Sequence, residues 1–146
     1  MNDQPTDPDC LFCAIVAGDI PARTVSSSTH TQAFLDVNPL SPGHTLVIPT
    51  GHYETLDEAP HAVRSAVFDT VGTLTPVIES AVDADATTIG MNNGEAAGQE
   101  IPHCHVHIVP RFEGDGGRPI HAVAGSPPDL DEAELDDIAT RIAQST

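Results

Sequence analysis

Lysine is absent from this sequence of 146 residues, and all five basic residues are arginines. Against them stand 22 acidic residues, which give the chain a formal net charge of −17. Proteins that bind nucleic acids neutralise phosphates with clustered Lys and Arg, and an anionic membrane surface repels a chain of this charge. The composition therefore predicts that neither a nucleic acid nor a membrane is a partner.

Long apolar runs are also missing. No segment approaches the roughly 20 apolar residues of a membrane-spanning helix, and the polar N-terminus has neither the basic start nor the apolar core of a signal peptide. We therefore expect a cytoplasmic protein. An acidic surface without lysine is typical of halophiles, because molar salt shortens the Debye length to about 3 Å and screens the self-repulsion. We hypothesise that the organism accumulates salt.

Aromatic residues are few. Tryptophan is absent, and the chain has one tyrosine and four phenylalanines. These side chains give a core little bulk, and dimerisation is one way to gain further burial. The hydrophobic fraction of 39% nevertheless argues against disorder for most of the chain.

Hydrophobic spacing predicts a mixed α+β domain. Apolar steps over residues 61–82 indicate one long amphipathic helix, a short helix over residues 11–16 ends at Gly18, and Asp131 caps a last helix. Five segments have strand character, at residues 24–28, 31–37, 44–49, 87–93 and 103–110, and their local connections favour an antiparallel sheet. The chain then divides into a disordered lead at residues 1–9, a domain at residues 10–112, and a Gly/Pro-rich segment with the C-terminal helix at residues 113–146.

Three histidines, His103, His105 and His107, alternate with apolar residues. Alternate side chains of a strand point the same way, so the imidazoles are expected to share one face. Three imidazoles make a hydrolytic zinc site; alternatively, one imidazole is a nucleophile that attacks phosphorus. The loop at residues 92–99 is rich in small and amide residues, whose N–H groups suit a phosphate, and this favours the nucleophile.

The segment Gly98–Arg111 resembles the signature of the histidine triad (HIT) family, in which His-x-His-x-His is followed by two apolar residues. The segments Cys10–Ile15, Ala33–Val37 and Gly43–Pro49 also resemble that family, in the expected order. The resemblance implies an α+β homodimer with a five-stranded antiparallel sheet, a long central helix and short N- and C-terminal helices. It also implies hydrolysis or transfer of a nucleoside monophosphate through a nucleotidyl-histidine intermediate.

The resemblance further assigns roles to single residues. It makes His105 the nucleophile, lets His107 contact the α-phosphate, and adds His44 and Gln99 as catalytic residues. Asp36 matches the acid that accepts the ribose hydroxyls. The substrate-binding residues that the resemblance implies are Phe12, Ile15, Phe34, Leu35, Asp36, Val37, Asn92, Gly98, Gln99, Glu100, Ile101 and His107.

Cys10 and Cys13 form a C-x-x-C motif. Two thiolates are half of a tetrahedral zinc site, and a disulfide framework is not expected inside a cell. A zinc-containing branch of the HIT family completes such a site with a histidine after the third strand and the first histidine of the triad, which implies His52 and His103. We therefore expect a structural zinc, and an inert Cys104 that faces the core.

Three functions remain open at this point. The first is a hydrolase acting through His105 on a purine nucleotide, either a dinucleoside polyphosphate or a nucleoside phosphoramidate. The second is a nucleotide-sensing or interaction module with negligible catalysis, and the third is a zinc-dependent hydrolase with its metal at the triad. Glu100 stands where some relatives carry a serine that meets the leaving group, so the leaving group also stays open.

Overall fold

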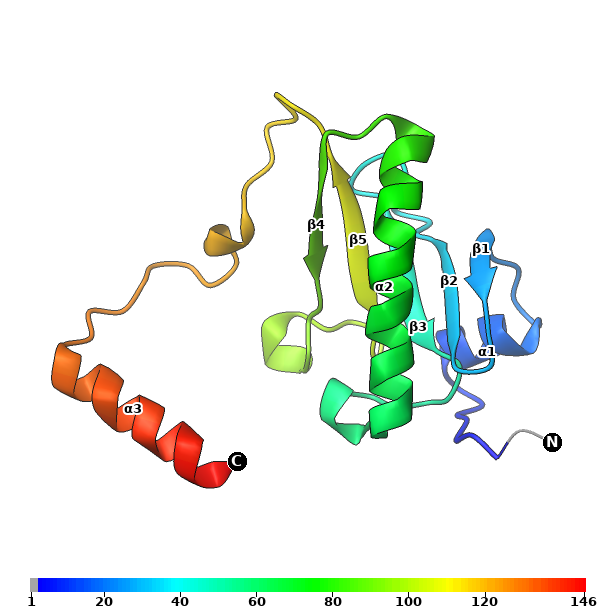
Figure 1. Cartoon of the computed structure of the whole chain (residues 1–146). Coiled ribbons are helices and arrows are strands. Elements are labelled where there is room, and N and C mark those ends of the chain that lie inside the picture. Colours follow the sequence, from blue (N-terminus) through cyan, green and yellow to red (C-terminus); the bar gives the residue numbers. More distant parts are fainter. Residues whose placement is uncertain (1–2) are drawn as a thin grey trace.

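The computed structural model describes residues 3–146 and contains a five-stranded antiparallel sheet with helices on both faces (Figure 1). The strand order is β1-β2-β3-β5-β4, so β4 forms one edge of the sheet. The predicted α+β class with an antiparallel sheet is confirmed. The strands are β1 (Thr24–Ser27), β2 (Thr31–Leu35), β3 (Thr45–Pro49), β4 (Ala86–Gly90) and β5 (Val106–Arg111).

Three α-helices accompany the sheet: α1 (Leu11–Ala17), α2 (His61–Val82) and α3 (Glu132–Ser145). The helix α1 ends at Gly18, whose φ of 85° is a left-handed conformation that glycine adopts without a steric cost. Asp131 caps α3, because its side chain accepts from the Glu134 N–H while the Glu134 side chain accepts from the Asp131 N–H. All three predicted helices are present.

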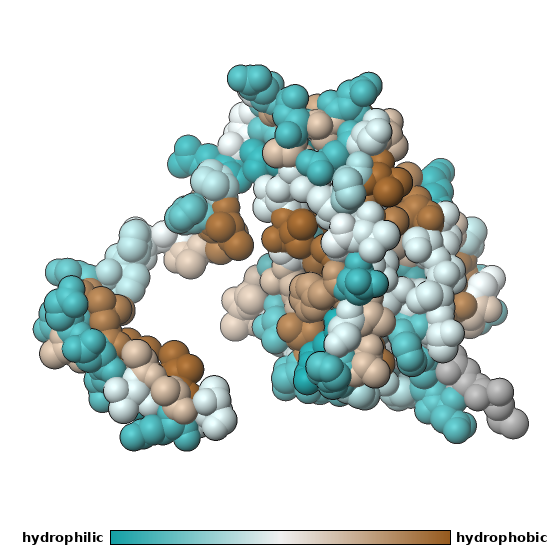
Figure 2. Space-filling view, viewed as in Figure 1, coloured by the Kyte–Doolittle hydropathy of each residue, from teal (hydrophilic) through white to brown (hydrophobic). Residues whose placement is uncertain are grey.

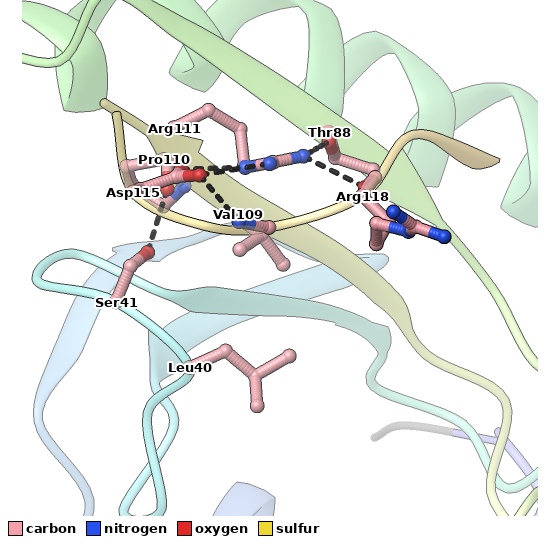
Figure 3. A pocket seen from close by; sticks show the side chains of 9 residues that line it. Leu40, Ser41, Thr88, Val109, Pro110, Arg111, Asp115 and Arg118 are labelled. Atoms are coloured by element: carbon pink, nitrogen blue, oxygen red, sulfur yellow. Dashed lines mark hydrogen bonds and ion pairs between the residues drawn. The ribbon is translucent and has the colours of Figure 1, made fainter. Parts of the chain in front are cut away.

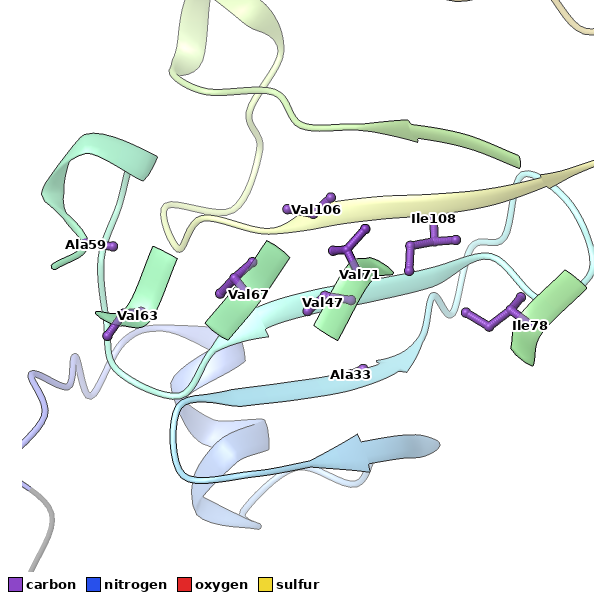
Figure 4. Close-up of a cluster of buried hydrophobic side chains, with 9 residues drawn as sticks. All are labelled: Ala33, Val47, Ala59, Val63, Val67, Val71, Ile78, Val106 and Ile108. Carbon is purple, nitrogen blue, oxygen red and sulfur yellow. The ribbon is translucent and has the colours of Figure 1, made fainter. Parts of the chain in front are cut away.

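The alternation of side chains along the strands gives the sheet two different apolar faces. Successive residues Leu46, Val47 and Ile48 of β3 belong in turn to the α1 side, the α2 side and the α1 side. On the α2 side the helix inserts residues three or four positions apart between the strands (Figure 4). That cluster comprises Ala33, Val47, Ala59, Val63, Val67, Val71, Ile78, Val106 and Ile108.

The face under α1 holds the cysteines, the two buried phenylalanines and the triad. Cys10, Cys13, Phe12 and Phe34 pack there with Leu46 and Ile48. Contrary to the prediction from the sequence, the three triad histidines do not all lie on one strand. The strand β5 begins only at Val106, so it contains His107 but neither His103 nor His105. His103 and His105 precede the ladder in an irregular segment, in which the Cys104 N–H bonds to the Tyr53 carbonyl.

The N-terminal lead is held against the domain from Gln4 onward, in contrast to the expected disorder. The Gln4 side chain accepts from the Thr50 hydroxyl at 2.6 Å, and the His52 N–H donates to the Pro5 carbonyl at 2.7 Å. The Cys10 N–H donates to the Asp7 carbonyl at 3.1 Å. The lead is expected to be disordered, but these hydrogen bonds, one between side chains and two between main-chain groups, hold it. Residues 1–2 lie outside the described part.

The C-terminal segment leaves the domain as an arm that ends in α3 (Figure 1). Every residue from Glu113 to Thr146 is exposed except the half-buried Ile138. Apolar side chains form a stripe along α3 on the side turned toward the rest of the molecule (Figure 2). Among residues 3–146, no helix combines the length and the hydropathy needed to span a bilayer.

Candidate active site

A cavity of about 530 Å³ lies on the α1 side of the sheet. It opens between α1, the end of β2, the loop before β3, the loop before the triad, and the triad. His44, His105 and His107 line it together with nearly all of the predicted substrate-binding residues. Those that line it are Phe12, Ile15, Phe34, Leu35, Asp36, Val37, Asn92, Gly98, Glu100 and Ile101.

The main chain fixes the protonation pattern of His105. Its Nδ1 lies 2.8 Å from the His103 carbonyl oxygen. A carbonyl only accepts, so Nδ1 carries the proton and Nε2 keeps its lone pair. Nε2 has no hydrogen-bond partner among residues 3–146, and the Phe12 ring packs edge-on against the imidazole with centroids 5.2 Å apart. The arrangement leaves one nucleophilic nitrogen in the lining of the cavity.

His44 and His107 form a hydrogen-bonded pair that begins at the main chain of the loop before β3. The Leu40 N–H donates to His44 Nδ1 at 3.0 Å, so the His44 proton sits on Nε2. Nε2 is 2.9 Å from His107 Nδ1 and donates to it. His107 therefore carries its own proton on Nε2 and is a donor at that atom.

Burial keeps these imidazoles neutral. Desolvation, with smaller contributions from His105 and His44, lowers the pKa of His107 to about 4. Burial also lowers the pKa of His44, although the Asp36 carboxylate, 3.7 Å from His44 Nε2, acts in the opposite direction. Neutral rings near pH 7 retain the donor and acceptor pattern given above.

The apolar end of the cavity is built from rings that also belong to the core. Phe12 and Phe34 meet edge to face with centroids 5.5 Å apart, and both are buried. Val37 is 75% exposed and stands at the mouth. Asp36 lies between the apolar end of the cavity and the histidines. One of its carboxylate oxygens accepts from the Asn38 N–H at 2.9 Å. Its other oxygen is the one turned toward His44.

Gln99 does not line the cavity, in contrast to the role that the resemblance implied. Its side-chain oxygen accepts from the Gly94 N–H at 2.7 Å. Its amide nitrogen donates to the carbonyls of Glu54 and Ile101 at 2.7 and 2.9 Å. All of its hydrogen bonds thus go to the main chain, and the side chain fastens the loop that carries Asn92, Gly98 and Glu100.

Leu40 is a site residue that the sequence did not indicate. Its side chain lines the cavity, and its N–H sets the His44 tautomer. Every residue except proline has a main-chain N–H, so a sequence motif cannot indicate which residue uses it as a donor. The two prolines and the glycine at residues 38–43 are an indirect signal in the sequence, since they imply a fixed turn.

The four predicted metal ligands come together below the cavity. One ligand atom from each of Cys10, Cys13, His52 and His103 lies within 4.8 Å of the others. His103 Nδ1 is 3.4 Å from the Cys10 sulfur and 3.7 Å from the Cys13 sulfur, and His52 Nδ1 is 3.4 Å from the Cys13 sulfur. The donor set is the Cys₂His₂ of structural zinc sites.

A hydrogen bond to His103 and a nearby carboxylate at His52 orient the two imidazoles for a metal. His103 Nε2 donates to the Pro49 carbonyl at 2.8 Å, which leaves the lone pair on Nδ1 beside the thiols. His52 Nε2 lies 3.8 Å from an Asp7 carboxylate oxygen, and its Nδ1 faces Cys13. Burial lowers the pKa of His103 to about 4, so the ring is neutral. The residues therefore fit a tetrahedral metal ion.

The triad does not form one metal cluster among residues 3–146. His103 groups with the cysteines, whereas His107 groups with His44 and Asp36 within 4.8 Å. In that second group the His44 lone pair faces the Leu40 N–H, so its Nε2 carries a proton and is not a ligand. The structure therefore argues against a hydrolytic metal held by all three triad histidines.

Comparisons with known proteins agree with this architecture. The HIT domain pattern matches residues 17–114. Protein hit of Bacillus subtilis is 40% identical over 145 residues, covering 94% of this chain and 97% of that protein. Adenylylsulfatase HINT3 of Arabidopsis thaliana is 43% identical over 107 residues, covering 73% of this chain and 54% of that protein.

A solved structure carries a metal. A Zn-bound histidine triad family protein from Mycobacterium smegmatis superposes with a TM-score of 0.70 and 30% identity, covering 94% of this chain and 98% of the other. The family pattern covers about two thirds of the chain, and the Bacillus subtilis protein matches along nearly its whole length. The chain belongs to the histidine triad (HIT) family.

Proposed function

We propose that the protein hydrolyses nucleotides at the α-phosphate, or transfers the nucleoside monophosphate, with His105 as the nucleophile. The observation that carries the proposal is the state of the His105 ring. Its proton is held on Nδ1 by the His103 carbonyl, and its unpartnered Nε2 belongs to the lining of the cavity. Neutral imidazole is a nucleophile toward phosphorus, and a covalent intermediate divides one difficult step into two.

The first step forms a bond between His105 Nε2 and the α-phosphorus. The bond from phosphorus to the leaving group breaks, and its electron pair goes to the leaving group, which takes up a proton from solvent. Water then attacks the phosphorus, the phosphorus–nitrogen bond breaks with its pair returning to Nε2, and one proton is released. The products are the nucleoside monophosphate, the protonated leaving group and the regenerated His105.

The surrounding residues suit a phosphate without any lysine. His107 directs an N–H, fixed by the chain from Leu40 through His44, at a phosphate oxygen. Such a donor is set before the reaction and stabilises charge that develops on that oxygen. Asp36 accepts the ribose hydroxyls, and the slot between Phe12, Ile15 and Phe34 takes a purine base. The name of the Arabidopsis relative, an adenylylsulfatase, supports an adenylylated substrate.

We propose a structural zinc at Cys10, Cys13, His52 and His103. With four protein ligands such an ion has no open position for a water, so it supplies cross-linking rather than hydrolytic chemistry. These residues join α1 to the segment after β3 and to the entry of the triad. Because His103 also supplies the carbonyl that sets the His105 tautomer, the ligand cluster positions the nucleophile.

The central experiment compares His105→Ala with wild type on diadenosine polyphosphates, adenosine phosphoramidate and adenylyl sulfate. We expect loss of turnover with retained AMP binding, and mass spectrometry of quenched wild-type enzyme should detect AMP on His105. His121→Ala is the matched control, since His121 is an exposed histidine on the arm. Full activity of His105→Ala would overturn the proposal. Tight AMP binding without turnover in wild type would instead indicate a nucleotide-sensing module.

We further propose that the protein is a homodimer in a salt-rich cytoplasm. Leu135 and Ile142 of α3 are 47% and 62% exposed, and Phe68 and Val77 of α2 are 46% and 59% exposed. An isolated helix of 14 residues is marginal in water, so α3 needs a surface to pack on, and the second copy supplies one. Sedimentation at increasing KCl should show dimers that dissociate as salt falls; a monomer at every salt concentration would contradict the proposal.

A further inference from the structure

A second cavity, of about 280 Å³, lies farther along the same face of the sheet as the active site. Val109 and Thr88 form its floor, Leu40 and Ser41 stand on one side, and Arg111 and Arg118 on the other (Figure 3). It contains two of the five arginines of the chain. The proposed reaction as described above uses neither of them.

The register of β5 connects this cavity to the catalytic histidines. Val106 and Ile108 point into the core under α2, so His107, Val109 and Arg111 share the opposite face. The four residue steps from His107 to Arg111 span about 13 Å at the rise of a strand. Leu40 lines both cavities, so the two are neighbours with one shared wall.

The hydrogen bonds of the Arg111 guanidinium hold the loop that follows β5. It makes two bonds to the Asp115 carboxylate, at 2.8 and 3.0 Å, and donates to the Thr88 hydroxyl and the Arg118 carbonyl, both at 3.0 Å. This guanidinium holds the pKa of Asp115 well below its usual range. The loop closes over Arg111 at Gly117, where a Cβ would collide with the guanidinium. The charge of Arg111 is therefore already neutralised.

Arg118 is different, because its guanidinium has no hydrogen-bond or ion-pair partner among residues 3–146. Arg111 fixes its main chain, and its side chain lies at the wall of the cavity (Figure 3). The charges of Arg111 and Asp115 cancel. The cavity therefore has one net positive charge, that of Arg118. The Arg118 side chain is exposed, so its guanidinium can reach an anionic ligand in this cavity, on a chain whose net charge of −17 otherwise repels one.

We propose that this cavity, with Arg118 as its ligand-binding cation, is a subsite for the phosphate chain that lies beyond the α-phosphate of the substrate. The inference rests on the proposed function. In a displacement at phosphorus the leaving group departs opposite the nucleophile, and β5, which follows directly on His105, runs past His107 to Arg111. A leaving group that is itself a chain of phosphates reaches Arg118, whereas the amine of a phosphoramidate does not. The subsite thus selects nucleoside polyphosphates, dinucleoside polyphosphates among them.

The test is a binding measurement that does not need turnover. Calorimetry in the His105→Ala background compares AMP with adenosine 5′-tetraphosphate, without divalent metal, for the parent, Arg118→Gln and Arg141→Gln. The last is the matched control: it removes the same charge from α3, where Arg141 pairs only with Asp137. Because the Arg118 guanidinium has no partner among residues 3–146, its substitution should leave the unfolding transition unchanged, and this is checked in parallel.

We expect the parent and Arg141→Gln to bind the tetraphosphate more tightly than AMP, despite the acidic surface. In Arg118→Gln the tetraphosphate should lose about fivefold in affinity, the scale of one partly exposed charge-assisted contact, while AMP is unaffected. Equal losses for both ligands, or none for either, would overturn the subsite. A protein that binds neither ligand would overturn the proposed function and the subsite with it. Normal AMP binding without any Arg118 effect would overturn the subsite alone.

Discussion

Replacing Gln99 distinguishes a residue that contacts substrate from one that holds a loop. The Gln99 amide makes three hydrogen bonds, all with main-chain groups, to Gly94, Glu54 and Ile101. Gln99→Ala leaves all of these groups without that partner. A net hydrogen bond is worth about 1 kcal/mol, and water can reach the exposed Glu54 carbonyl, so we expect the free energy of unfolding to fall by about 2 kcal/mol.

The substitution Gln99→Glu makes the test sharper. A carboxylate keeps the acceptor for the Gly94 N–H but loses both donors and faces the carbonyl oxygens of Glu54 and Ile101. Repulsion between these oxygens should make Gln99→Glu at least as unstable as Gln99→Ala, although glutamate is the closer isostere. Gln32→Ala is the control, because its amide makes a single exposed bond to Thr24 at 3.1 Å, and it should change stability by less than about 0.5 kcal/mol.

Urea denaturation gives the stability of each variant, and kcat/KM on a nucleotide gives its activity at a temperature where all are folded. If Gln99 only fastens the loop, both of its variants lose stability, and activity falls through misplacement of Asn92 and Gly98. Loss of activity in Gln99→Ala with the unfolding free energy of wild type would refute this reasoning. It would restore the direct catalytic role that the family resemblance implied.

Two further predictions concern the histidines and the cysteines. NMR titration of the ring protons should show His107 protonating near pH 4, since burial lowers its pKa to about 4. That pKa lies below the value of about 6.5 in an unfolded chain. His107 therefore favours the folded state above pH 6.5, and this contribution to stability is lost as the pH falls toward 4. A midpoint at 6.5 or higher would contradict the burial argument. Elemental analysis should find one zinc per chain in wild type and in Cys104→Ala, and none in Cys13→Ala, whose thermal midpoint should also fall. Metal-free wild-type protein as purified would exclude the zinc site.

The sequence predicted the elements that have a strong period or a cap. The helix over residues 61–82 is found with those bounds, because its apolar steps of three and four match the spacing at which α2 meets the sheet. The prediction was wrong for the start of β5, which begins at Val106 rather than at residue 103. The alternation of His103 and His105 predicts a strand, but the His103 side chain donates to the Pro49 carbonyl and the Cys104 N–H donates to the Tyr53 carbonyl, so no ladder forms before Val106.

The part of the candidate site that consists of side chains could be predicted from the sequence. Motif positions predicted the four candidate metal ligands, Cys10, Cys13, His52 and His103, and the structure brings them together. They also identified His44, His105 and His107, which share one cavity. What the sequence could not show is the role of main-chain groups, such as the Leu40 N–H, because any residue except proline supplies one.

Under the proposed function, those main-chain groups explain how so acidic a chain holds a phosphate. The proton on each ring of the site is placed by a backbone partner: the His103 carbonyl for His105, the Leu40 N–H for His44, and through His44 for His107. Neutral donors placed in this way need no cation, and salt screens them less than it screens an ion pair, because they carry no net charge. If the proposed function holds, such a site keeps its phosphate contacts at molar salt, where binding that relied on lysine would weaken. In the proposed subsite, a substrate that extends beyond the α-phosphate adds one charged contact, to Arg118, which lines the second cavity.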